Sequence, residues 1–123
     1  MNDQNKNLET IRKLAVDWIH YWQIASNPEL NTRTFRKQIE RGEHPLSYVL
    51  SQEAELMNKD PEGAWQLILE LIPKAENEGI LALIAAGPLE DLLNRYPDNF
   101  KERVDEMARK DALFRKCLAM VWR

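Results

Sequence analysis

Residues 85–93, with the sequence AAGPLEDLL, constrain the fold of this chain more than any other stretch. Gly87 can adopt the left-handed conformation that closes a helix, and Pro88 suits the first position of the next one. Glu90 and Asp91 would then place negative charge at the positive N-terminal end of that second helix. The stretch therefore predicts two helices that meet at a tight corner, with Gly87 and Pro88 as its structural residues.

Similar signals divide the rest of the chain into short helices. Asp60 followed by Pro61 is typical of a helix start, and Pro73 is typical of a helix end. Pro97 and Asp111 suit the start of two further helices. Apolar residues recur at steps of three and four between these points, and no stretch alternates as a strand would. The segments expected to be helical are about 7–25, a short or irregular helix within 29–44 that ends in a turn at Gly42, 45–58, 60–72, 75–86, 88–95, 97–110 and 111–122.

The length and composition favour one helical domain. A chain of 123 residues can form a single core, and 44% hydrophobic with 30% charged residues is typical of a soluble, folded protein. We therefore expect an all-α fold, a compact single-domain array of about six to seven short antiparallel helices with helical-repeat-like packing. Residues 1–6 are expected to be a frayed N-terminus, and residues 7–123 the single helical domain.

One helix is expected to lie at the centre of the core. Residues 80–86 are apolar on every side, which is the pattern of a helix with no exposed face. Four Trp supply large apolar side chains to the same core. The residues expected to share it are Trp18, Trp65, Leu83, Ile84, Leu92, Val104 and Leu118.

The charge pattern narrows the classes of partner. The formal net charge is −3, from 17 basic and 20 acidic side chains interleaved along most of the chain, with residues 29–44 the one locally basic stretch. Nucleic-acid binding usually requires a basic stripe, so no nucleic-acid partner is expected.

No apolar run approaches the roughly 18 residues of a spanning helix, and the first residues lack a secretory signal, so no membrane partner is expected. The single cysteine, Cys117, is typical of a reducing compartment, and we expect a cytoplasmic protein.

The residue types that carry most enzyme chemistry are sparse. His20 and His44 are the only histidines, and neither has the spacing of a metal motif with Cys, Asp or Glu. Cys117 lies among apolar residues, which predicts a buried, unreactive thiol. Pairs of carboxylates such as Glu53 and Glu55 are expected to form a solvated face, since neighbours two apart on a helix do not face one another. We therefore assign no catalytic residue, no metal ligand and no cofactor.

One polar group is a candidate for partner binding. Glu90, Asp91, Arg95 and Tyr96 cluster around the predicted corner, where a rigid scaffold could present them to another protein. Capping and local ion pairing would explain the same residues as structural features. Both interpretations stay open at this point.

An aromatic group on the first helix is the other candidate. Trp18, Tyr21 and Trp22 recur at helical spacing and could present an aromatic anchor to a partner. Aromatic side chains at this spacing more often belong to the core. The core is therefore the favoured interpretation.

The second half of the chain carries a resemblance to a known family. The residues concerned are Asp60-Pro61 with Ala64-Trp65, the stretch Ala86–Leu93, Asp111 with Phe114-Arg115, and the terminal Val121-Trp122, with a weaker likeness over residues 18–22. Together they resemble a family of small bacterial proteins classed as a domain of unknown function, and Gly87-Pro88-Leu89-Glu90 is the most specific part. The resemblance implies a bacterial origin and an all-helical domain. It implies no activity, so it assigns no functional residue.

The favoured function is a non-enzymatic protein-interaction module that presents a preformed acidic to mixed surface. One concrete form is an immunity protein or antitoxin, since a small acidic domain can neutralise a basic toxin through complementary charge. A small-molecule-binding protein or enzyme with a pocket near Glu90, Asp91 and Arg95 is one alternative, and a structural homodimer is another. A toxin gene immediately upstream would favour the immunity protein, whereas a metabolic operon would favour the enzyme.

Overall fold

The longest helix, α1 (Asn2–Ala25), packs along α4 (Pro61–Leu71) in the most extensive helix contact of the protein. The computed structural model describes residues 2–121, and the side chains of residues 7–121. α1 begins at Asn2, earlier than the expected start near residue 7. Its buried side chains recur at steps of three and four, as an amphipathic helix requires: Ile11, Leu14, Ala15, Trp18 and Ile19.

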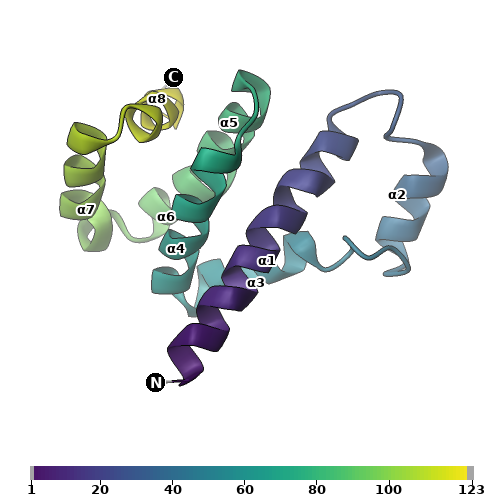
Figure 1. Ribbon diagram of the computed structural model, residues 1–123, viewed down its shortest axis with the longest axis horizontal. Helices are drawn as coiled ribbons and strands as arrows, with labels where there is room; N and C mark the ends of the chain where they lie inside the picture. The colour runs from purple at the N-terminus through teal and green to yellow at the C-terminus, as the bar shows by residue number, and fades with distance from the viewer. Residues whose placement is uncertain (1, 122–123) are drawn as a thin grey trace.

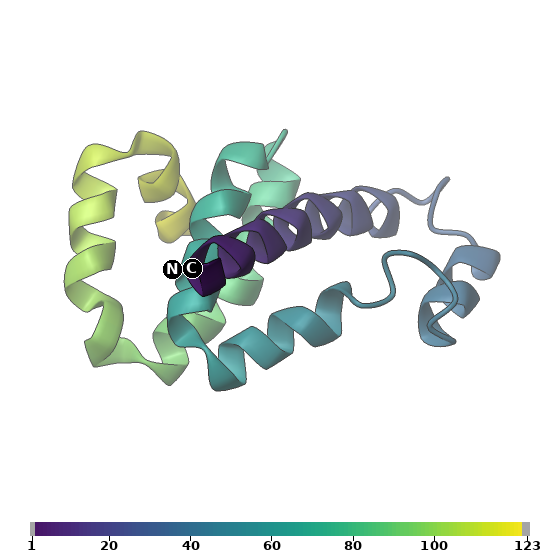
Figure 2. The same cartoon turned by 60° about the horizontal axis from the view of Figure 1, so that its bottom comes forward.

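The prediction of an all-α fold is confirmed, and residues 2–121 contain no strand. α1 and α4 lie side by side in the middle of the molecule, α7 and α8 lie at one end, and α2 stands off at the other (Figures 1 and 2). The remaining elements are α2 (Arg33–Glu40), α3 (Val49–Lys59), the 3-10 turn η1 (Ile72–Lys74), α5 (Glu78–Ile84), the π-turn η2 (Ala85–Leu89), α6 (Glu90–Arg95), α7 (Pro97–Lys110) and α8 (Ala112–Val121).

Side-chain caps explain where several helices begin. The Asp60 carboxylate accepts a hydrogen bond from the N–H of Gly63 at 3.0 Å, and Pro61 occupies the first turn of α4. The Asp111 carboxylate likewise accepts from the N–H of Phe114 at 3.0 Å. These bonds satisfy amide groups that have no partner within the helix. Both starts agree with the sequence prediction.

α3 begins at Val49 and not at Pro45 as predicted. The residues before it form a turn that their own side chains hold: the N–H of Leu46 donates to Nδ1 of His44 at 3.0 Å, and the N–H of His44 donates to Oγ of Ser47 at 3.1 Å. Such local bonds compete with helical hydrogen bonding. The periodicity of the apolar residues therefore extends beyond the helix itself.

The predicted corner at Gly87 and Pro88 is wrong, because the helix continues from α5 through η2 into α6. Gly87 does not have positive φ. Pro88 has no N–H, and its ring would clash with the carbonyl group of Ile84 in a regular α-helix. The π-turn relieves this conflict by widening the helix, and the N–H of Glu90 donates to the carbonyl oxygen of Ala85, five residues earlier. The Gly-Pro pair therefore bulges one helix and does not separate two.

The left-handed glycine of this chain is Gly42, with φ +72°. It follows α2. The N–H of Gly42 donates to the backbone oxygen of Ile39 at 3.1 Å, and the N–H of Glu43 donates to the backbone oxygen of Gln38 at 2.9 Å. This pair of bonds is the Schellman ending of a helix, which favours glycine because a side chain is strained at positive φ. The predicted turn at Gly42 is confirmed.

The predicted core is largely confirmed. Trp18, Trp65, Ile84, Leu92 and Val104 are buried in one cluster. Leu83 and Leu118 are only half-buried and pack against the edge of that cluster. The side chains expected at the centre of the core therefore include two that lie on its boundary.

No helix within residues 2–121 is both long enough and apolar enough to cross a membrane. α1 has 24 residues, which exceeds the length that a bilayer requires. Its middle turns contain Arg12, Lys13 and Asp17, so its composition and not its length excludes a span.

Replacing Trp65 with Ala should destabilise the protein by about 3–5 kcal/mol, because the substitution removes a large buried side chain and leaves a cavity. The Trp65 ring packs against Phe100, with centroids 5.7 Å apart, and against Phe114 at 5.8 Å. Urea denaturation measures the change. Leu50→Ala, at a side chain that is 42% exposed, is the control and should change stability by about 0.5 kcal/mol or less. Equal stability for the two variants would contradict this role of Trp65.

Replacing Gly87 with Ala should raise the free energy of unfolding by about 0.4–1 kcal/mol, since alanine has less conformational freedom in the unfolded chain. Apart from its chain neighbours and the backbone of its own helix, a Cβ atom built at Gly87 meets no atom within 4 Å. Gly42→Ala is the matched control and should destabilise by roughly 1–2 kcal/mol, because φ is positive there. Thermal and urea unfolding compare the two variants, and destabilisation by Gly87→Ala would restore the corner interpretation.

Candidate functional site

Two of the four residues proposed for partner binding contact α3, and a third pairs with one of them within α6. The Arg95 guanidinium pairs with the Asp91 carboxylate at 2.8 Å and also donates to the side chain of Asn58 in α3. The Tyr96 hydroxyl donates to the backbone oxygen of Met57 at 2.9 Å. The structure therefore brings Asp91, Arg95 and Tyr96 together on a seam between α3 and α6, where each has a partner within the protein.

Glu90 does not lie at the start of a separate helix, where it was expected. Because α5 runs into α6 through the π-turn, Glu90 is not at a free helix N-terminus, and its N–H is already bonded to Ala85 and Gly87. The Glu90 side chain is half-buried. The expected interaction of Glu90 and Asp91 with the dipole of a new helix is therefore absent.

Glu53 is the charged residue of this seam that the sequence analysis missed. Its carboxylate is partly buried and accepts a hydrogen bond from Nε1 of Trp18 at 2.7 Å. Burial raises the pKa of Glu53, and the nearby negative charge of Asp91 adds to this effect, while the hydrogen bond from Trp18 opposes it. Among the described residues, no cationic side chain forms an ion pair with Glu53.

A signal for Glu53 was present in the sequence. Val49, Glu53 and Met57 are spaced four residues apart, so they share one line along α3, and both outer members are buried. Glu55, in contrast, is exposed and lies 3.6 Å from the ammonium group of Lys59. The two carboxylates that were expected to share a solvated face therefore occupy different environments.

A second cluster of charged groups joins the start of α3 to α1. The Tyr48 hydroxyl donates to the Asp17 carboxylate at 2.5 Å, and the Lys13 ammonium donates to the same oxygen at 2.8 Å. Burial alone would raise the pKa of Asp17, but the bonds from Lys13 and Tyr48 bring this pKa below its usual value. Each polar group of the cluster has a partner, so the cluster serves as a connection between two helices.

The aromatic residues of α1 belong to the core and its edge. Trp18 is buried, while Tyr21 and Trp22 are half-buried and pack edge to face with ring centroids 5.1 Å apart. Tyr21 also contacts Phe35 of α2, at 6.1 Å between centroids. These contacts use the rings to attach α2 to α1. The core interpretation of this group is therefore the better one.

Cys117, His20 and His44 have three different environments. The Cys117 thiol is fully buried near the backbone oxygen of Leu81, at 3.6 Å, and burial raises its pKa to about 11. At neutral pH it therefore stays protonated and is a poor nucleophile. His20 is exposed, and His44 packs edge to face on Phe35. Within the part of the chain that the structure describes, no three His, Cys, Asp or Glu side chains are grouped to hold a metal ion.

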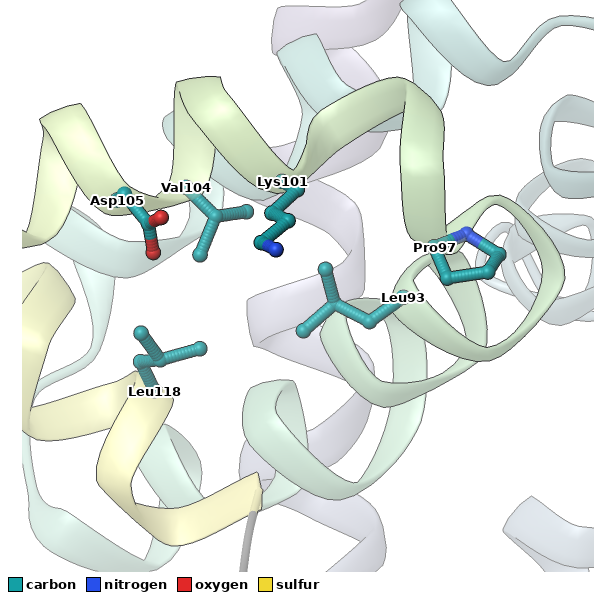
Figure 3. Close-up of a pocket in the computed structure, with 6 residues that line it drawn as sticks. All are labelled: Leu93, Pro97, Lys101, Val104, Asp105 and Leu118. Carbon is teal, nitrogen blue, oxygen red and sulfur yellow. The ribbon is translucent and has the colours of Figure 1, made fainter.

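The opposite side of α6 forms one wall of a groove. Figure 3 shows its six lining residues: Leu93 from α6, Pro97, Lys101, Val104 and Asp105 from α7, and Leu118 from α8. Val104 and Leu118 face each other across an opening of about 240 Å³. The Lys101 ammonium and the Asp105 carboxylate extend from the same side of the groove. Three helices thus form an open apolar slot beside side chains of opposite charge.

The groove and the seam lie on different sides of α6. Leu93 lines the groove, whereas Asp91 and Arg95 take part in the seam with α3. The groove contains no Ser, Cys or His among its lining residues, and it contains one carboxylate. Its chemistry therefore suits the binding of an apolar group beside a charged or polar one.

The chain matches one known family, and no curated protein and no solved structure matches it. The family model extends over residues 36–123, which includes the groove and both sides of the seam between α3 and α6. α1, with the Trp18 side chain that binds Glu53, lies outside the matched residues. The chain belongs to the family described as "Family of unknown function (DUF6869)".

Proposed function

We propose that this chain is a non-enzymatic protein-interaction module that takes an apolar side chain of a protein partner into the groove between α6, α7 and α8. The observation that supports the proposal is the groove itself, where Leu93, Val104 and Leu118 form apolar walls beside Lys101 and Asp105. Protein interfaces commonly combine an apolar centre with a polar rim. A partner residue with an apolar end and polar neighbours would match both parts.

The size of the groove favours a side chain over a free ligand. Sites for small molecules usually have volumes of about 300–1,000 Å³ and enclose most of the ligand. The groove has about 240 Å³ and opens to solvent. One large apolar side chain presented by a partner would occupy it without further enclosure.

The partner that we propose is basic. The chain has a net charge of −3, and the carboxylate that lines the groove, Asp105, is exposed. A cationic partner would be steered toward the chain by this opposite charge. An immunity protein or antitoxin that neutralises a basic toxin in the bacterial cytoplasm is the specific form of this proposal.

A library of random peptides displayed on phage tests the groove with the purified full-length chain. The enriched peptides should share one large apolar residue flanked by basic residues. Leu93→Phe fills the groove from its wall, so it should weaken a selected peptide by about tenfold or more, the scale of a lost anchor contact. Isothermal titration calorimetry measures the dissociation constants.

Leu50→Phe is the matched control, because it makes the same exchange at an exposed leucine of α3. This variant should bind the selected peptide as tightly as the parent chain. If the library gives no enriched sequence, or if Leu93→Phe binds as tightly as the parent, the groove does not have the proposed role.

A small-molecule-binding protein or an enzyme that uses Glu90, Asp91 and Arg95 is the second candidate. The observation that favours it is that the Glu53 carboxyl, whose pKa is raised, lies near a second carboxylate, that of Asp91. Two carboxyl groups in different environments are the arrangement that acid-base catalysis uses. The Arg95 guanidinium is already engaged by Asp91 and Asn58, which makes this candidate the less favoured one.

Glu53→Gln tests whether the ionised carboxylate destabilises the fold. An acid whose pKa is raised in the folded state holds its proton more tightly there, so stability falls as pH rises from the usual value of 4.5 through the raised pKa. At pH 7 the glutamine variant should therefore unfold at a higher temperature than the parent, while keeping an acceptor for Trp18. The difference should shrink toward zero below pH 4.5.

Glu55→Gln is the control for this measurement, because the Glu55 side chain is exposed on the same helix. It should show no gain in melting temperature at pH 7. A lower melting temperature for Glu53→Gln at pH 7 would mean that the charged form of Glu53 stabilises the fold, and would contradict the direction of its pKa shift.

A further inference from the structure

The solvent-facing side of α2 carries a row of positive charges. Arg33, Lys37 and Arg41 are spaced four residues apart, so they follow one line along the helix and its C-terminal end. All three are exposed, while Phe35 and Ile39 point the other way into the protein. We call Arg33, Lys37 and Arg41 the basic stripe.

The basic stripe forms no ion pair with the described residues of its own molecule, although the exposed Glu40 lies three residues after Lys37 on α2. Like charges four residues apart on a helix repel one another and destabilise it. α2 therefore keeps an unfavourable arrangement of charges that an anionic surface would relieve.

α7 carries the complementary arrangement. Asp98, Glu102 and Glu106 are also spaced four residues apart and exposed, on the side of α7 opposite the buried Phe100 and Val104. We call Asp98, Glu102 and Glu106 the acidic stripe.

Most of the acidic stripe is also without an ion-pair partner. Asp98 and Glu102 form no ion pair with any described residue, while Glu106 lies 3.5 Å from the exposed ammonium group of Lys110. A helix rises about 1.5 Å per residue, so charges within each stripe repeat every 6 Å or so. Because both stripes have the same repeat, three positive groups can face three negative groups when the helices lie side by side.

The two stripes cannot pair within one molecule. α2 lies at one end of the long axis and α7 at the other, and both views agree on this separation (Figures 1 and 2). α1, α3 and α4 lie between them. Contact between the stripes therefore requires two molecules.

The geometry points to self-association, in which α2 of one molecule docks along α7 of a second copy of this chain through the basic and acidic stripes. The contact joins exposed charges, so it is reversible and weak at physiological ionic strength. This inference concerns a different surface from the groove, although α7 contributes to both.

A charge-swap experiment tests the contact with two full-length variants. The first carries R33E, K37E and R41E, so both of its stripes are acidic. The second carries D98K, E102K and E106K, so both of its stripes are basic. Each substitution replaces an exposed side chain with another that favours helices, and circular dichroism checks that both variants remain folded.

Sedimentation velocity at low ionic strength should show concentration-dependent association of the parent chain. Each variant alone should associate at least about tenfold more weakly, because its stripes now repel. An equimolar mixture should recover association, since the basic helix of one variant can again face the acidic helix of the other. High salt should dissociate the parent and the mixture alike, as the screening length falls to about 3 Å at 1 M.

A third variant with E9K, E55K and E76K serves as the control, because it changes the net charge as much as the second variant does and leaves both stripes intact. It should associate like the parent. A monomeric parent chain at low ionic strength, or a mixture that associates no better than its components, would overturn the inference.

Discussion

The packing of α1 on α4 is the contact on which the rest of the fold depends. α1 buries Trp18 on one side of the molecule, and α4 presents Trp65 to Phe100 of α7 and Phe114 of α8 on the other. α4 therefore links α1 to the helices that form the groove. The matched family region begins at residue 36 and leaves α1 out, although α1 covers a large part of α4. Without α1, or another cover in its place, the apolar surface of α4 would meet water.

The sequence predicted those parts of the fold that depend on local bonds. Asp60 and Asp111 begin helices because their carboxylates cap amide groups three residues later, and this needs no information about distant parts of the chain. Gly87 and Pro88 misled the prediction because a π-turn can accommodate a proline within one helix. Burial of Leu89 beside them favours this outcome, and burial depends on neighbouring helices that a local signal does not identify.

The candidate site was less predictable because it arises between helices. The sequence identified Asp91, Arg95 and Tyr96 as neighbours, but their partners in α3 come from contacts distant in sequence. Glu53 follows the buried line of α3, yet a single charged residue on that line gives no sign that a Trp18 indole will meet it. Leu118 was expected inside the core and instead forms one wall of the groove. Apolar spacing predicts which side of a helix turns inward, but not how completely its neighbours cover it.

The order of charged residues along the sequence likewise does not show how those charges are arranged on the surface. Basic and acidic residues are interleaved along the chain, and this pattern predicted a surface without a basic stripe. A helix brings residues four apart to the same side, so Arg33 and Lys37 share one side of α2 although three residues separate them in the sequence. Asp98 and Glu102 are brought together on α7 in the same way. Interleaving along the sequence is therefore compatible with segregation on the surface, since three basic residues follow one line along α2 and its C-terminal end and three acidic residues follow one line along α7.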